Sequence, residues 1–398
     1  MSLAHGRQYL AIPGPSVTPD RVLRAMHRPS MNIYAGELVE LTHSLVPDLK
    51  AVARTDHNVA IYISNGHGAW EAALANTLSR GDKVLVLATG RFAHGWADMA
   101  RMMGVECDIV DYGKQSDIDI SRMEDALRAD TGHAYKAVLA VQVDTSTSVK
   151  NDIPALRQCL DRVGHPALLM VDCIACLGCD RFEMDAWGVD VMVAGCQKGL
   201  MTPPGLGFVF FNDRAAKARE SANCVTHYWD WTLRADPEMY YQYFDGTAPT
   251  HHLYGLREAL DMIQEEGLET VWERHTTFAR AVWAALDHWG QEGDVRMNIA
   301  DPALRSTAVT TVRTAPPEAD ALRAWCETQG GVTLGIGLGM VEPGEPGAGG
   351  FFRIGHMGHL NPHMVLGGLS VIEAGMIATG ITHRPGGVTA AARVLAGA

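Results

Sequence analysis

The chain has 398 residues, of which 47% are hydrophobic and 20% are charged, and its formal net charge is −13. This length exceeds the size at which a single core stops growing, so we expect two domains, and the apolar fraction excludes a globally disordered chain. The acidic excess argues against a nucleic-acid backbone as partner, and no apolar run approaches the roughly 20 residues that span a membrane.

The first half of the chain alternates between helical and strand patterns. Apolar residues at helical spacing, such as Leu38, Leu41 and Leu45, predict an amphipathic helix. Short apolar runs bounded by glycine and polar residues predict strands. The expected helices cover residues 20–26, 38–54, 69–79, 94–103, 123–129 and 153–163, and the expected strands cover 59–64, 83–88, 106–110, 136–143, 167–172, 189–194 and 208–211.

This alternation indicates an α/β fold with a mostly parallel sheet and helices on both faces. No G-x-G-x-x-G motif follows the first strand, which counts against a dinucleotide-binding fold. Helices are also expected at 253–264 and 269–289, and the domain boundary is placed near there. The remainder predicts a smaller α+β unit with helices at 318–329 and 362–379 and strands at 308–312 and 351–354. Residues 330–350 are rich in glycine and predict a mobile or ligand-adapted loop. The tail from Arg384 is expected to be poorly ordered.

The cysteines are expected to be reduced thiols of a cytoplasmic protein, because the N-terminus lacks the apolar core of a signal peptide. Cys173, Cys176 and Cys179 have a spacing that occurs in metal and iron–sulfur sites. No fourth ligand lies nearby, and the segment continues a strand-and-turn pattern in which cysteine serves as a small buried residue. We therefore favour packing for these thiols and predict no metal site.

Unusual polar or aromatic residues follow the ends of several predicted strands. In open parallel sheets, ligands bind beyond the carboxyl ends of the strands. Taken alone, each such residue is equally well explained as a turn, core or surface residue. The set comprises Asn65-Gly66-His67-Gly68 at the start of a helix, Phe92, Thr145-Ser146, Asp172 and Lys198.

One ligand, pyridoxal 5′-phosphate, would use all of these residues. It needs an anion site for its phosphate, which a glycine-rich helix start provides through backbone N–H groups. It also needs a flat surface for its ring, a carboxylate at its pyridine nitrogen and a lysine amine. Asp172 and Lys198 are separated by one turn and one strand, which suits two neighbouring strand ends that face one cavity.

The motifs around these residues resemble the class V aminotransferases of fold type I, in the branch of the alanine–glyoxylate and serine–glyoxylate aminotransferases. The resemblance covers nearly the whole chain in order. It rests on residues 13–15, 66–74, 171–178, 195–200, 203–205, 253–260 and 353–358. It implies a large domain with a mostly parallel seven-stranded sheet at residues 18–265, and a smaller α+β domain made of residues 1–17 and 266–398.

The resemblance also implies roles for individual residues. Lys198 matches the Schiff-base lysine, and Asp172 matches the partner of the pyridine nitrogen. Arg353 matches the arginine that binds the substrate carboxylate, a task that suits its bidentate fork. The positions that match other cofactor contacts are Phe92 over the ring, Thr145 beside the ring oxygen, and Asn65, Gly66, His67 and Gln197 on the phosphate side.

Thr247 matches a phosphate ligand that the family donates from the neighbouring subunit, which implies a homodimer with shared sites. Three positions depart from the family pattern or leave a role open. Tyr34 lies where the family carries a His-Arg pair and is a candidate for the substrate mouth. Phe244 replaces an expected phosphate-binding tyrosine. His356 is expected either to contact substrate or to cap the turn.

The expected function is a ping-pong transamination from serine, alanine or aspartate to glyoxylate, which gives glycine and a 2-keto acid. The alternative within the same cofactor class is a pyridoxamine–pyruvate aminotransferase that uses free pyridoxamine. A lyase or cysteine desulfurase ranks lower, because the 330–350 segment contains no cysteine. A non-catalytic binding protein that uses the same pocket is the remaining alternative.

Overall fold

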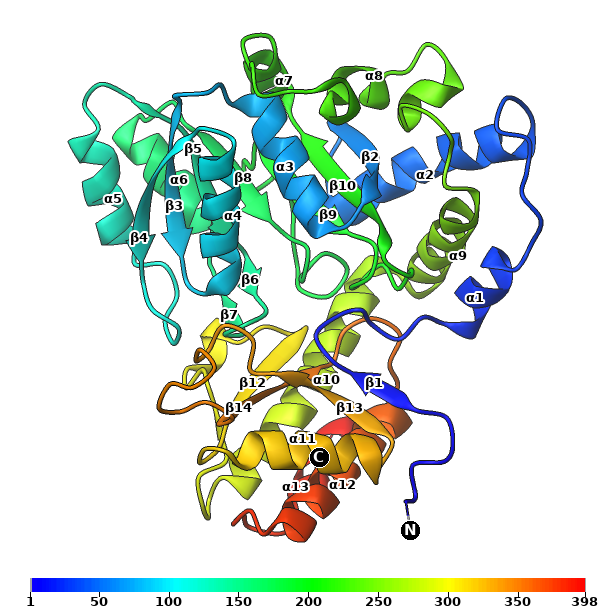
Figure 1. Cartoon of the computed structure of the whole chain (residues 1–398), viewed down its shortest axis with the longest axis vertical. Helices are drawn as coiled ribbons and strands as arrows, with labels where there is room; N and C mark the ends of the chain where they lie inside the picture. The colour runs from blue at the N-terminus through cyan, green and yellow to red at the C-terminus, as the bar shows by residue number, and fades with distance from the viewer. Residues whose placement is uncertain (1, 398) are drawn as a thin grey trace.

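The computed structural model describes residues 2–397 and contains two main sheets, one above the other in the view of Figure 1. The large sheet has seven strands in the order β2-β10-β9-β8-β5-β3-β4. Only β10 runs antiparallel to its neighbours, so the predicted mostly parallel seven-stranded sheet is confirmed. The strands are β2 (Asn58–Ser64), β3 (Lys83–Ala88), β4 (Glu106–Asp111), β5 (Tyr135–Val141), β8 (Leu168–Asp172), β9 (Val191–Gly195) and β10 (Gly205–Phe211).

Helices cover both faces of the large sheet because successive strand residues point to opposite sides. In β3, Val84 and Val86 pack into one core cluster, while Leu85 and Leu87 pack into the other. The first cluster lies under α3 (Gly66–Thr77) and α4 (Arg91–Met102). The second is covered by α2 (Glu37–Ala53), α5 (Ile120–Ala129), α6 (Ile153–Val163) and α9 (Thr250–Glu266).

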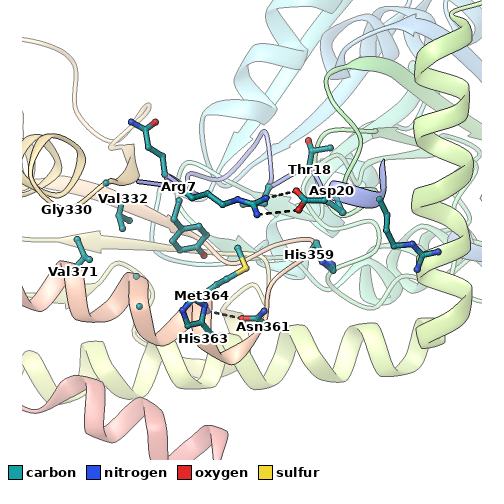
Figure 2. Close-up of a pocket in the computed structure, with 18 of the residues that line it drawn as sticks. Arg7, Thr18, Asp20, Gly330, Val332, His359, Asn361, His363, Met364 and Val371 are labelled. Atoms are coloured by element: carbon teal, nitrogen blue, oxygen red, sulfur yellow. Dashed lines mark hydrogen bonds and ion pairs between the residues drawn. The ribbon is translucent and has the colours of Figure 1, made fainter. Parts of the chain in front are cut away.

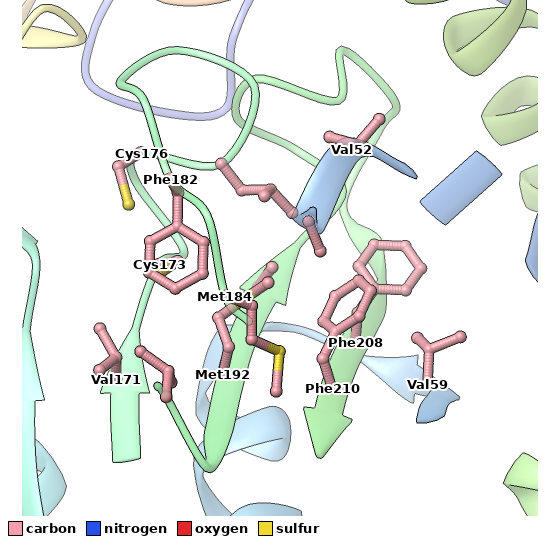
Figure 3. Packing of buried hydrophobic residues seen from close by; sticks show 14 of the residues in the cluster. Val52, Val59, Val171, Cys173, Cys176, Phe182, Met184, Met192, Phe208 and Phe210 are labelled. Atoms are coloured by element: carbon pink, nitrogen blue, oxygen red, sulfur yellow. The ribbon is translucent and has the colours of Figure 1, made fainter. Parts of the chain in front are cut away.

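Figure 3 shows part of the second cluster, where side chains of neighbouring strands meet a buried loop. Phe208 and Phe210 of β10 and Met192 of β9 pack beside Phe182 and Met184. Burial of each such side chain contributes about 1.5–3 kcal/mol, so this packing fixes the positions of the strand ends above it. The large sheet also carries α1 (Asp20–Met26), α7 (Asp213–Arg219), α8 (Trp231–Ala235) and the short turns η1 (His227–Trp229) and η2 (Tyr240–Tyr243).

The smaller sheet has five strands in the order β1-β13-β14-β12-β11. These are β1 (Tyr9–Ala11), β11 (Arg296–Met297), β12 (Val309–Arg313), β13 (Val332–Ile336) and β14 (Phe351–Gly355). They pack with α10 (Leu268–Trp289), α11 (Glu318–Thr328), α12 (Pro362–Thr379) and α13 (Gly387–Leu395) around a third core cluster. A short turn, η3 (Pro302–Leu304), precedes β12, and the hairpin β6 (Val143–Asp144) with β7 (Val149–Lys150) lies between the two sheets in the view of Figure 1.

Two sequence expectations are wrong for this smaller unit. The glycine-rich segment after residue 330 is not all loop, because β13 pairs there with β1 and β14. The tail from Arg384 forms α13, which packs on α10 and buries Ala391 completely. Gly387 allows the close approach of this helix, since a side chain there would collide with Trp289.

Candidate active site

A cavity of about 260 Å³ lies at the carboxyl ends of the large-sheet strands. Because β8 and β9 are parallel neighbours, their carboxyl ends meet there, one carrying Asp172 and the other leading into Lys198. Eight predicted residues line this cavity: Asn65, Gly66, His67, Phe92, Thr145, Asp172, Gln197 and Lys198. Four residues that the sequence did not indicate complete the wall: Trp70, Val143, Ile174 and Ala175.

Lys198 lies on the turn between β9 and β10, and its Nζ donates a hydrogen bond to the Pro13 carbonyl. Burial of the amine and, secondarily, the charge of Arg353 lower the pKa of Lys198 to about 8. A lysine with this pKa is neutral in a useful fraction near pH 8, which a nucleophile or proton carrier requires.

The N-terminal segment holds this lysine in place. Ser16 Oγ donates to the Lys198 carbonyl over 2.7 Å, and Ser16 N–H donates to the Gln197 carbonyl over 2.8 Å. Gly14 has a φ of +99°, and a side chain at this position would collide with Lys198. The Pro-Gly-Pro segment at residues 13–15 is therefore part of the site wall, although only its resemblance to the family singled it out.

Asp172 is 4% exposed and accepts two hydrogen bonds from neutral donors. Ile174 N–H donates to Oδ1 over 2.7 Å, and the Trp70 indole N–H donates to Oδ2 over 2.9 Å. Burial raises the pKa of Asp172 to about 7, and both hydrogen bonds act in the opposite direction. A buried carboxylate with this arrangement is suited to accept a further hydrogen bond from a positively charged group in the cavity.

The start of α3 forms another wall. The Asn65 side chain caps this helix by accepting from His67 N–H over 3.0 Å and from Gly68 N–H over 3.4 Å. A side chain at Gly66 would collide with Ile174, so the close approach of this turn requires glycine. Nearby, Gln197 Oε1 is buried and has no hydrogen-bond partner among residues 2–397. This wall therefore offers a helix N-terminus to an anionic group and an unpaired carbonyl oxygen to a hydrogen-bond donor.

Arg353 comes from β14 of the smaller sheet and connects the two sheets. Its Nη1 donates to the Thr145 carbonyl over 2.9 Å, and its Nε donates to the Ile336 carbonyl over 2.6 Å. Burial lowers the pKa of Arg353 to about 10, while Asp144 opposes that shift. The guanidinium is hydrogen-bonded to Thr145, which lines the cavity, but Arg353 itself is not part of the cavity wall.

Besides Arg353, three other predicted residues do not line the cavity. Thr247 is exposed on the segment between η2 and α9, and Tyr34 is 82% exposed on the loop before α2. His356 is 1% exposed, and both ring nitrogens are bonded within 2.9 Å, one to Thr310 Oγ1 and one to the Thr307 carbonyl. Burial lowers the pKa of His356 to about 4, so this histidine is neutral and tied to its own domain.

The other features that the sequence raised lie elsewhere. Cys173, Cys176 and Cys179 are buried, and Cys176 Sγ donates to Gln142 Oε1 over 2.8 Å. Within residues 2–397, no group of three or more histidine, cysteine and acidic side chains is placed to hold a metal ion. No helix in that range combines the length and apolarity needed to cross a membrane.

A larger cleft of about 580 Å³ lies between the N-terminal arm, α1 and α12 (Figure 2). An ion pair between Arg7 and Asp20 crosses it, and its wall includes His359 and His363. None of the predicted site residues lines this cleft. The smaller cavity is the candidate active site, because among residues 2–397 it combines a lysine of lowered pKa with a buried carboxylate.

Comparison with known proteins agrees with this geometry. The family described as "Aminotransferase class-V" matches residues 8–345. The chain is 38% identical to a serine–glyoxylate aminotransferase of Methylorubrum extorquens, over 97% of this chain and 95% of that protein. It is 36% identical to an L-aspartate–glyoxylate aminotransferase of Paracoccus denitrificans, over 96% of this chain and 94% of that protein. Its fold is similar to the crystal structure of a pyridoxamine–pyruvate aminotransferase from Mesorhizobium loti, with a TM-score of 0.86 and 25% identity over 99% and 98% of the two chains.

Proposed function

The chain belongs to the class-V aminotransferase family, and we propose that it transfers the amino group of a small L-amino acid to glyoxylate with pyridoxal 5′-phosphate bound at Lys198. The donor is serine, alanine or aspartate, and the products are glycine and a 2-keto acid. The observation that carries this proposal is the meeting of Lys198 and Asp172 in one cavity at two adjacent strand ends. The names of two relatives, which specify serine and L-aspartate as partners of glyoxylate, support the substrate class.

The residues of the cavity fit this cofactor. Asp172 would face the pyridine nitrogen, and Phe92 would cover the ring. Gln197 and His67 line the side expected to hold the phosphate, where the Gln197 side-chain N–H groups would donate to it. Asn65 Oδ1 already caps the start of α3, so we expect the phosphate to compete with this cap. Bound pyridoxal 5′-phosphate supplies an electron sink for the bond broken at the substrate α-carbon.

Lys198 performs the proton transfer in this proposal. Its pKa of about 8 leaves a substantial fraction as the neutral amine in mildly alkaline solution. Once an amino acid occupies the site, the free amine would accept the proton from the substrate α-carbon and deliver it to the cofactor carbon that takes up the amino group. The same residue acts in both halves of the ping-pong cycle, because the 2-keto acid leaves before glyoxylate enters.

Arg353 orients both substrates through the feature that they share, a carboxylate next to the reacting carbon. Its Nε and Nη1 are held by main-chain carbonyls, and its Nη2 has no partner within residues 2–397. This anchoring fixes the guanidinium before substrate arrives, which lowers the entropic cost of orienting the substrate. A carboxylate bound there would lie beside the cavity wall at Thr145, whose carbonyl accepts from Arg353.

A homodimer completes the site in this proposal. Several large apolar side chains near Thr247 are exposed, including Met239 at 59% and Tyr241 at 49%. The neighbouring end of β2 exposes Ile63 at 41% and is tied to this region by Tyr228, whose hydroxyl donates to the Ile63 carbonyl. Exposed apolar side chains gathered around one segment are typical of a protein interface.

Subunit complementation tests this sharing of sites. Lys198→Ala and Thr247→Glu each inactivate every site of their own homodimer. In a mixed dimer, one site combines the intact lysine of one subunit with the intact threonine of the other. Random mixing therefore restores about a quarter of the wild-type sites if the interface has twofold symmetry. No recovery in a mixture shown to contain mixed dimers would contradict the shared site.

The half-reactions of the holoenzyme test the substrate assignment. Addition of serine, alanine or aspartate is expected to bleach the visible absorbance of the bound cofactor, and addition of glyoxylate is expected to restore it. The initial rates rank the three donors. No spectral change with any of them would reject the proposed function.

The same spectra distinguish the alternative in which free pyridoxamine is the amino donor. The similarity to the structure of the Mesorhizobium loti enzyme is the observation in its favour. That alternative does not require a retained phosphorylated cofactor. We expect the purified protein to keep a visible chromophore through gel filtration, whereas loss of the chromophore with turnover of free pyridoxamine and pyruvate would support the alternative.

A further inference from the structure

Trp70 has a position in the cavity that neither the motifs nor the proposed reaction explains. It lies in the second turn of α3, is 1% exposed, and places its indole N–H 2.9 Å from Asp172 Oδ2. An indole N–H can only donate a hydrogen bond. It therefore bonds more strongly to an ionised carboxylate than to the neutral acid.

Aromatic side chains pack against the indole ring of Trp70 on several sides and fix the orientation of its N–H group. It stacks on Trp96 with centroids 5.9 Å apart and planes 15° apart. Its other aromatic contacts are edge contacts with Phe92, at 6.2 Å, and with His67, at 4.7 Å. Phe92 and His67 themselves line the cavity. Trp70 therefore contacts the residue expected to cover the cofactor ring, a residue expected on the phosphate side, and the carboxylate of Asp172.

Asp172 depends on this donor because it has few others. No lysine or arginine forms an ion pair with it within residues 2–397, and its second donor is the Ile174 N–H at 2.7 Å. These two neutral donors are the main compensation for the burial of this carboxylate, and the charge of Lys198 adds a smaller contribution. Removal of one of them leaves a buried anion poorly satisfied, which favours its protonated form.

We infer that Trp70 is a positioning residue that keeps Asp172 ionised and aimed at the protonated ring nitrogen of the cofactor. The inference rests on the proposed function, because it assumes that pyridoxal 5′-phosphate binds in this cavity. Trp70 donates a hydrogen bond to Asp172 and thereby fixes the position and charge of the carboxylate that faces the ring nitrogen. Loss of Trp70 should therefore weaken binding of a cofactor ring that is protonated at this nitrogen more than binding of a ring that lacks the nitrogen.

Trp70→Phe removes the donor and keeps an aromatic ring, and Trp96→Phe is the matched control. Trp96 is 0% exposed and stacks on the same indole, but its own N–H has no partner among the described residues. Both variants therefore lose a similar aromatic area, and only Trp70→Phe loses a hydrogen bond to a carboxylate.

The measurement is the dissociation constant of the apoprotein for two compounds. One is pyridoxal 5′-phosphate, and the other is its analogue with a C–H group in place of the ring nitrogen. A hydrogen bond to a charged group corresponds to roughly ten- to hundredfold in binding. Trp70→Phe is expected to lower the preference for pyridoxal 5′-phosphate over the analogue by about tenfold or more. Wild type and Trp96→Phe are expected to keep the same preference within about twofold.

An unchanged preference in Trp70→Phe would overturn the inference and leave the proposed function intact. Failure of the wild-type apoprotein to bind pyridoxal 5′-phosphate would instead reject the proposed function. If Trp70→Phe does not fold, replacement of Trp70 by benzothienylalanine gives the same test, because sulfur replaces the N–H while the bicyclic shape is kept. Loss of the preference in that variant supports the inference, and retention overturns it.

Discussion

Replacement of Arg353 by lysine separates a substrate-binding role from a structural one. The arginine uses Nε and Nη1 on the carbonyls of Ile336 and Thr145, at 2.6 and 2.9 Å, and leaves Nη2 for a substrate. Lysine keeps the positive charge but lacks the planar fork, so it cannot hold these carbonyls and face a carboxylate together. Loss of one hydrogen bond to a carboxylate, about 2 kcal/mol, lowers kcat/KM by about 30-fold.

Arg305→Lys is the matched control for this variant. Arg305 is 9% exposed against 7% for Arg353, and it also donates to two main-chain carbonyls, over 2.9 and 2.7 Å. It does not line the cavity. We expect similar losses of thermal stability in the two variants and a fall of kcat/KM for glyoxylate, at saturating amino donor, only in Arg353→Lys. Equal losses of kcat/KM in both variants would refute the assignment of Arg353 to the substrate carboxylate.

Three further predictions concern the site and its supports. Burial raises the pKa of Asp172 from 3.8 to about 7, so the folded apoprotein holds a proton that the unfolded chain releases. The free energy of unfolding therefore falls by up to about 4 kcal/mol as the pH rises from 4 to 7. Asp172→Asn should remove this pH dependence, as measured by urea unfolding at a series of pH values. An equal slope in both proteins would contradict the buried proton. Arg234→Ala should cost about 3–5 kcal/mol in the same assay, because Arg234 is 1% exposed and donates to four main-chain carbonyls that would be left unpaired. Gly14→Ala should displace Lys198 and abolish retention of the cofactor, whereas Gly36→Ala, at a similar φ but with no atom within 4 Å of the new Cβ, should keep it. Retention by Gly14→Ala would show that this contact does not control the lysine.

The alternation of strand and helix was enough to predict the large sheet, because burial on both faces of a parallel sheet leaves a strong apolar pattern. The starts of the helices were predicted less well. α4 begins at Arg91 instead of residue 94, because Asp144 Oδ2 and Ser146 Oγ accept from the first N–H groups of this helix. These acceptors come from a distant part of the chain, so no local signal marks the start.

The smaller domain was harder to predict for a similar reason. β1 has three residues, and the strand that pairs with it within residues 2–397 is β13, more than 300 residues away in a glycine-rich segment. The buried residues of α13, Gly387 and Ala391, are small, and their burial depends on the fit against α10. Strands and helices of this kind are defined by their partners more than by their own propensities.

The site shows the same division. The residues at strand ends, Asp172 and Lys198 above all, were predicted to share a cavity because the topology of a parallel sheet brings those ends together. Trp70 was missed because a buried tryptophan in a helix is ordinarily a core residue, and its role depends on the direction of one N–H group. Thr247 and Tyr34 stay predictions, since both are exposed in the single subunit.

The most direct test of the central claim is the identity of the residue that carries the cofactor. The holoenzyme is reduced with borohydride, digested and analysed by mass spectrometry, with Lys198→Ala treated in parallel. We expect the phosphopyridoxyl group on the peptide that contains Lys198 and on no other peptide, and no incorporation in the variant. Attachment to a different lysine, or equal incorporation in Lys198→Ala, would contradict the assignment of this cavity as the active site.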